Sequence, residues 1–127
     1  MSKRILVIDD DAEFVDAVAG ILRSKDYLVS YAASGKEGIK KVLADGADLI
    51  ILDVMMTHRT EGFEVARKLK VDPKTAQIPI VMITGIRKEM NLPFGFDVDS
   101  QWLPVKAVLE KPVKPQVLLE TIEHALR

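Results

Sequence analysis

Acidic side chains, one threonine and one lysine stand at the ends of apolar runs. Asp9 and Asp10 follow one such run, and Asp53 follows another. Thr84 follows a third run, and Lys111 lies just beyond a fourth. If these runs are neighbouring parallel strands, their carboxyl ends meet at the edge of the sheet where ligands bind. Carboxylates, a hydroxyl and an ammonium group in one pocket suit phosphoryl chemistry assisted by a divalent metal.

The elements that would position these residues alternate between strand and helix. Leu49 to Leu52 has the length and branching of a strand buried on both faces. Apolar runs of the same length or shorter occupy residues 5–8, 80–83 and 107–109. Residues 28–32 alternate between apolar and polar side chains, as an edge strand does. Apolar residues recur at helical spacing in segments 12–25, 34–46, 63–71 and 115–126. This alternation predicts a parallel sheet with helices on both faces.

Several helix boundaries can also be predicted. Ser34 suits an N-cap, with Glu37 three residues later completing a capping box. Asp11, just before a helix, is best interpreted as an ordinary N-cap. Pro115 suits the first turn of the last helix. The apolar stripe of that helix is expected to face inward through Val117, Leu118, Ile122 and Leu126.

The stretch between Thr84 and Lys111 departs from this regular alternation. Residues 90–104 contain Pro93, Gly95, Phe94, Phe96 and Trp102, and their apolar residues keep no helical period. We therefore expect an atypical long loop where a regular protein of this class has its fourth helix.

Composition indicates one ordinary domain. The chain has 127 residues, which fits a single domain over 1–127. It has no cysteine, which excludes disulfides and thiolate metal sites. Its net charge is −1, from 18 basic and 19 acidic residues, so we expect no direct nucleic-acid binding. No apolar stretch or leader pattern predicts membrane insertion or export, so a cytoplasmic location is expected.

Five pieces of sequence, in order and at strand ends, resemble a known family. They are the stretches 5–11, 49–56, 62–65, 80–85 and 109–113. Together they resemble the receiver domain of two-component response regulators over nearly the whole chain. The resemblance implies a flavodoxin-like, doubly wound α/β fold, with a five-stranded parallel sheet in the order 2-1-3-4-5.

The resemblance also implies a metal site. Asp9 and Asp10 match the acidic pair that holds Mg²⁺ in the family, with Asp53 and the backbone carbonyl of Met55 as further ligands. The expectation is chemically sound, because Mg²⁺ prefers oxygen ligands and offsets the repulsion among neighbouring carboxylates.

By the same resemblance, Asp53 is the phosphoacceptor, and Thr84 and Lys111 contact the phosphoryl group. The implied donor is a sensor histidine kinase or a phosphotransfer protein, and the implied target is an unknown downstream protein. The chain is then no ordinary enzyme. The resemblance implies a phosphoacceptor that assists its own phosphorylation and slow dephosphorylation.

Three features depart from the family pattern. Thr57 stands where the family usually has a proline, and Val108 stands where it usually has an aromatic switch residue. The stretch from Thr84 to Lys111 is also several residues longer than usual. We hypothesise that the output signal leaves through residues 85–104, in place of a rotating aromatic ring.

The residues argue against two other functions and leave a third open. A phosphatase of the haloacid-dehalogenase type needs an acid two residues after the nucleophile, where this chain has Met55. A flavin-binding protein needs a phosphate-binding loop after the first strand, where three aspartates would repel phosphate. An interaction module with the receiver fold, not controlled by phosphorylation, stays open.

Overall fold

Strands and helices alternate along the chain as the apolar runs predict. The computed structural model describes residues 2–53, 61–84, 105–111 and 113–127. Its elements are β1 Arg4–Ile8, α1 Ala12–Arg23, β2 Leu28–Ala32, α2 Gly35–Asp45, β3 Leu49–Asp53, α3 Glu61–Val71, β4 Ile80–Thr84, β5 Ala107–Glu110 and α5 Pro115–Ala125.

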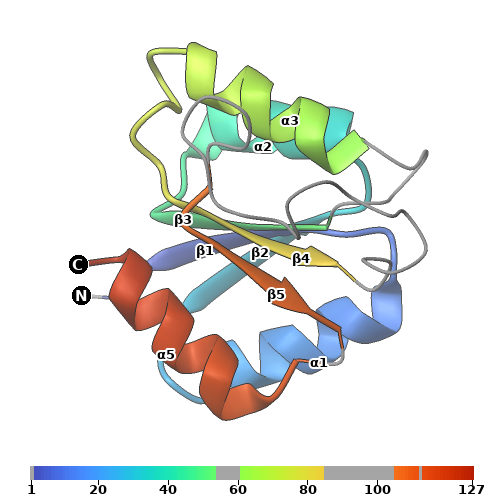
Figure 1. Cartoon of the computed structure of the whole chain (residues 1–127), viewed down its shortest axis with the longest axis vertical. Helices are drawn as coiled ribbons and strands as arrows, with labels where there is room; N and C mark the ends of the chain where they lie inside the picture. Colours follow the sequence, from blue (N-terminus) through green and yellow to red (C-terminus); the bar gives the residue numbers. More distant parts are fainter. Residues whose placement is uncertain (1, 54–60, 85–104, 112) are drawn as a thin grey trace.

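The five strands form one sheet in the order β2-β1-β3-β4-β5 (Figure 1). Every neighbouring pair is parallel, which confirms the predicted doubly wound topology. All five residues of the central strand β3 are buried, as its unbroken apolar run requires. The outer strand β2 has only one buried residue, Ala32, as an edge strand does.

Helices α2 and α3 cover one face of the sheet, and α1 and α5 cover the other (Figure 1). Strand side chains alternate between two buried clusters, one on each face. We call the first the α2/α3-face cluster; it comprises Leu6, Ile8, Ala32, Val42, Ile50, Leu52, Phe63, Val65, Ala66, Leu69, Ile80, Met82 and Val105. We call the second the α1/α5-face cluster; it comprises Ile5, Val7, Val15, Val18, Leu22, Leu49, Ile51, Val81, Ile83, Leu118 and Ile122. Odd-numbered residues of β1 and β3 therefore face α1 and α5.

Short polar side chains and special backbone positions end the helices. Asp11 caps α1, because its side chain accepts a hydrogen bond from the backbone N–H of Phe14. Ser34 caps α2 in the same way through Glu37 N–H, as predicted. Gly46 ends α2 with φ of +75°, a conformation that glycine adopts without a Cβ penalty.

Helix α2 approaches β1 closely through a glycine. A Cβ built on Gly38 would lie 2.4 Å from Cδ1 and 2.7 Å from Cγ1 of Ile8, which is fully buried. Ile8 directly precedes Asp9, so this close packing fixes the end of the strand that carries the acidic pair.

Two packing details differ from expectation. Val117 is 44% exposed, although its place in the apolar stripe of α5 predicted an inward position. Helix α1 ends at Arg23, two residues earlier than expected, because Ser24 forms its C-cap. The predicted loop over residues 85–104 lies outside the described residues.

The helices are short, with 12 residues in α1 and 11 each in α2, α3 and α5. In the part of the chain that the structure describes, none of them has the length and hydropathy needed to span a bilayer.

Candidate functional site

Asp9 and Asp53 lie next to each other at the carboxyl edge of the sheet. Ile8 on β1 pairs in register with Leu52 on β3, so the next residues along are Asp9 and Asp53. Both are odd-numbered and continue the rows of side chains that face α1 and α5. The two central strands thus deliver two carboxylates to one side of the same edge.

Three carboxylates converge there. Asp9, Asp10 and Asp53 each offer an oxygen, and these atoms all lie within 4.8 Å of one another. Asp9 is 1% exposed and Asp53 6%, whereas Asp10 is open to solvent. Neighbouring carboxylates repel each other strongly when water is excluded, so this arrangement favours a bound cation.

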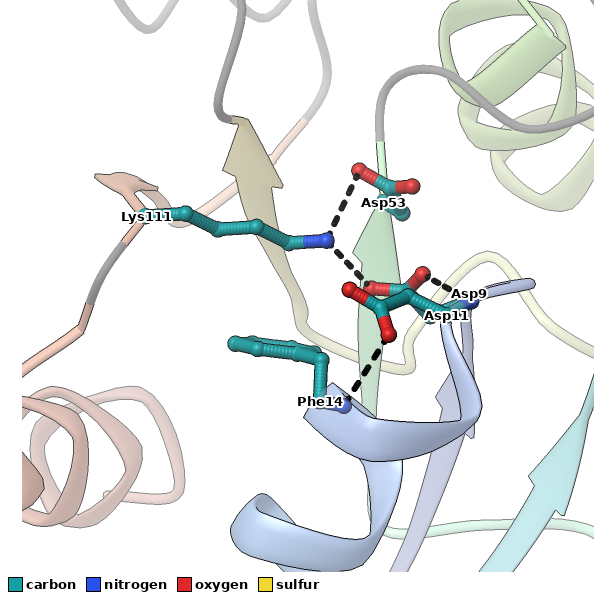
Figure 2. Close-up of polar contacts among 5 residues, drawn as sticks. All are labelled: Asp9, Asp11, Phe14, Asp53 and Lys111. Atoms are coloured by element: carbon teal, nitrogen blue, oxygen red, sulfur yellow. Dashed lines mark hydrogen bonds and ion pairs between the residues drawn. The ribbon is translucent and has the colours of Figure 1, made fainter.

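Lys111 supplies one positive charge to this pocket. It follows β5, and its Nζ lies 3.0 Å from Oδ2 of Asp9 and 4.0 Å from Oδ1 of Asp53 (Figure 2). Its side chain is 22% exposed, so the ammonium group reaches inward from the surface. The structure therefore brings together four residues that the sequence placed at three separate strand ends.

The two oxygens of Asp9 have different partners. Oδ1 accepts a hydrogen bond of 2.9 Å from the backbone N–H of Asp11. Oδ2 is buried and accepts no well-aligned hydrogen bond among the described residues. Its ion pair with Lys111 is close in distance but not aligned as a hydrogen bond. A buried carboxylate oxygen with spare lone pairs, beside two further carboxylates, is the hard donor set that Mg²⁺ takes.

Phe14 belongs to the surroundings of Lys111, which the sequence did not reveal. The Nζ of Lys111 lies 4.3 Å from the centroid of the Phe14 ring. Figure 2 shows the lysine chain extending across this ring toward the two aspartates. In the sequence, Phe14 is one of the apolar residues at helical spacing in segment 12–25, and no local pattern indicates a partner so distant in sequence.

Two other predicted site residues lie partly or wholly outside the part of the chain that the structure describes. Thr84 ends β4, and its backbone is in register with Glu110, the residue before Lys111. The structure does not describe its side chain. Met55 lies outside the described residues. Val108, at the position of the family's aromatic switch, packs partly buried against the α2/α3-face cluster.

Comparison with known proteins agrees with this geometry. The sequence matches the family described as "Response regulator receiver domain" over residues 5–123. Response regulator PleD of Caulobacter vibrioides is 44% identical over 86 residues, which is 68% of this chain and 19% of PleD. The phosphate regulon transcriptional regulatory protein PhoB of Pseudomonas aeruginosa is 32% identical over 127 residues, covering 100% of this chain and 53% of PhoB. The chain thus spans about half the length of these curated relatives, or less.

Solved structures agree as well. Chemotaxis response regulator CheY4 of Vibrio cholerae superimposes with a TM-score of 0.84 at 27% identity, covering 99% of this chain and 100% of that one. A putative response regulator from Chloroflexus aurantiacus gives a TM-score of 0.86 at 26% identity, with 99% and 98% covered. The motifs, the sheet order and these matches lead to one conclusion: the chain belongs to the response regulator receiver domain family.

Proposed function

We propose that Asp53 accepts a phosphoryl group from a histidine kinase or a phosphotransfer protein, in a reaction that depends on Mg²⁺. The observation that carries this proposal is the meeting of three carboxylates within 4.8 Å at the carboxyl edge of the sheet, with the ammonium of Lys111 beside them. Asp53 is proposed as the acceptor because it ends the central strand β3, and the Lys111 Nζ lies 4.0 Å from its Oδ1.

The transfer itself is a displacement at phosphorus. A carboxylate oxygen of Asp53 forms a bond to phosphorus while the bond from phosphorus to the donor's imidazole nitrogen breaks. The imidazole leaves with the electron pair of that bond and takes up a proton from solvent. Lys111 stabilises negative charge on a peripheral phosphoryl oxygen, since such transfers depend mainly on positioning and electrostatics. Thr84, at the end of β4, is proposed to donate its hydroxyl hydrogen to a second phosphoryl oxygen.

The metal would be held by Asp9, Asp10 and Asp53, with the carbonyl of Met55 as a further ligand. When bound, Mg²⁺ lowers the repulsion between the incoming phosphoryl group and the carboxylates. Asp9 keeps its orientation through the hydrogen bond that its Oδ1 accepts from Asp11 N–H, which leaves Oδ2 directed into the pocket.

Phosphorylation would change the contacts of Lys111. The acyl phosphate adds about −1.5 to −2 charge at Asp53. In this structure Lys111 is nearer to Asp9 than to Asp53. After phosphorylation it would move toward the phosphoryl oxygens and shift the loop that follows β5. This redistribution of contacts is proposed to alter a protein-binding surface recognised by a downstream partner.

Intact-protein mass spectrometry after treatment with a small acyl phosphate and Mg²⁺ tests the proposal. The parent should gain one phosphoryl group, and Asp53→Asn should gain none. Asp16→Asn is the matched control, because Asp16 is exposed on α1 and lies outside the carboxylate cluster. It should be labelled like the parent.

Full labelling of Asp53→Asn, or the same labelling with and without Mg²⁺, would contradict the proposal. A parent that stays unlabelled would instead favour a receiver-fold interaction module that phosphorylation does not control.

A further inference from the structure

Two carboxylates and one aromatic ring contact the ammonium group of Lys111 from different directions. Asp9 and Asp53 attract its ammonium from the strand ends, at 3.0 Å and 4.0 Å. The face of Phe14 lies on the helix side, with the ring centroid 4.3 Å from Nζ. Figure 2 shows the ammonium between the ring and the two carboxylates.

Phe14 lies in the first turn of α1, between the helix cap and the core. Its backbone N–H donates to the Oδ1 of the N-cap residue Asp11, at 3.2 Å, so the first turn of α1 holds its main chain. Its side chain is partly buried and packs against the α1/α5-face cluster. A ring packed against the core in this way can limit where a flexible lysine chain lies.

On these contacts, and resting on the proposed function, we propose that Phe14 is a positioning residue for phosphorylation: its ring face holds the Lys111 ammonium beside Asp53. An aromatic face attracts a cation through its quadrupole, within about 6 Å of the centroid. Unlike another carboxylate, it adds no formal charge that would compete with the phosphoryl group for the lysine.

A purely structural role makes a different prediction. If Phe14 serves only to fill space beneath the aliphatic stem of Lys111, then leucine, which is also apolar, should replace it adequately. If the ring face matters, tyrosine should replace it and leucine should not. Phe14→Leu and Phe14→Tyr therefore form a matched pair that separates the two roles.

The contact is tested first without any phosphorylation. In the parent, the ε-methylene protons of Lys111 should show an upfield ring-current shift in NMR spectra. The shift should disappear in Phe14→Leu and persist in Phe14→Tyr. Lysine ε-methylene protons that resonate at the same position in all three proteins would refute the contact.

The positioning role is tested by the rate of phosphorylation by a small acyl phosphate with Mg²⁺. Phe14→Leu should be about two- to fivefold slower than the parent, as expected for a partly exposed cation–π contact. Phe14→Tyr should keep at least half of the parent rate. In a Lys111→Met background, Phe14→Leu should cause no further loss, because the cation it positions is gone.

The outcomes separate this inference from the proposed function. A Phe14→Leu rate equal to that of the parent, or an equal loss in the Lys111→Met background, overturns the positioning role and leaves the phosphoacceptor assignment standing. A parent that takes up no phosphate overturns both, even if the ring-current shift is present. Thermal unfolding of each variant confirms that the rates compare folded proteins.

Discussion

The ammonium nitrogen of Lys111 lies closer to Asp9 than to Asp53, at 3.0 Å from Oδ2 against 4.0 Å from Oδ1. The lysine therefore offsets the negative charge of Asp9, the most buried of the three carboxylates. This is also a carboxylate that would bind the proposed metal. Metal and lysine would compete for Asp9, and phosphorylation would give the lysine a new partner at Asp53.

Replacing Lys111 should therefore strengthen Mg²⁺ binding while weakening phosphorylation. Lys111→Met removes a positive charge beside the metal position. For a partly exposed group, the gain should be about 1 kcal/mol, or roughly fivefold in affinity. Calorimetric titration with Mg²⁺ measures it. Lys114→Met, an exposed lysine three residues later, is the control and should bind as the parent does. Equal affinities in the parent and Lys111→Met would argue against competition.

The carboxylate cluster should couple Mg²⁺ to stability. Without metal, Asp10→Asn should raise the free energy of unfolding by a few tenths of a kcal/mol, because one repelling charge is removed. Its unfolding temperature should be slightly higher than that of the parent. Saturating Mg²⁺ should stabilise the parent by about 2.7 kcal/mol at 100 times its Kd and the variant by much less. Asp16→Asn, exposed on α1 outside the cluster, should keep the full metal effect. An undiminished metal effect in Asp10→Asn would place the metal elsewhere.

Gly38 should not tolerate a methyl group. Gly38→Ala places a Cβ 2.4 Å from Cδ1 of the fully buried Ile8, so it should destabilise the fold by about 1–3 kcal/mol through overpacking. Gly20→Ala is the control, because a Cβ there meets nothing within 4 Å. It should stabilise α1 by about 0.5–1 kcal/mol through helix propensity. Denaturant unfolding measures both, and equal effects would contradict the packing argument.

Tyr27 should make the fold sensitive to alkali. Its pKa lies above the ordinary value of 10.0, first because burial disfavours the phenolate and second because the Glu123 carboxylate repels it. The folded state then holds this proton more tightly than the unfolded state. The contribution to stability is fully present below pH 10.0 and is lost as pH rises through the folded pKa.

Glu123→Gln should lower the pKa of Tyr27 but leave it above the ordinary value, since burial is the larger cause. Phenolate absorbance measures this in a Tyr31→Phe background, where Tyr27 is the one remaining tyrosine of the 2 in the chain. A pKa unmoved by Glu123→Gln would show that the carboxylate does not act on the phenol.

The strands and the acidic cluster could be predicted because their signals are local. A strand buried on both faces must be apolar at every position, which the run from Leu49 to Leu52 satisfies. Once the sheet order is set, the two-residue repeat of a strand places Asp9 and Asp53 on one side of one edge. The sheet order itself was predicted from the resemblance to the receiver family and not from these local signals.

Other features depend on packing that the sequence does not encode locally. Val117 is next to the fully buried Leu118, yet it is turned by about 100° around the helix and lies exposed. The contact between Phe14 and Lys111 joins residues 111 − 14 = 97 positions apart, so neither local spacing nor composition indicates it. The roles given to Thr84 and Met55, and to residues 85–104 in the output, remain predictions.

The most direct test of the central claim is to locate the phosphorylated residue. Treating the parent with a small acyl phosphate and Mg²⁺, reducing the acyl phosphate with borohydride, and mapping the peptides identifies the aspartate that carried the group. The account predicts modification at Asp53 alone, and only when Mg²⁺ is present. Modification at Asp9 or Asp10, or at Asp53 to the same extent without Mg²⁺, would contradict it.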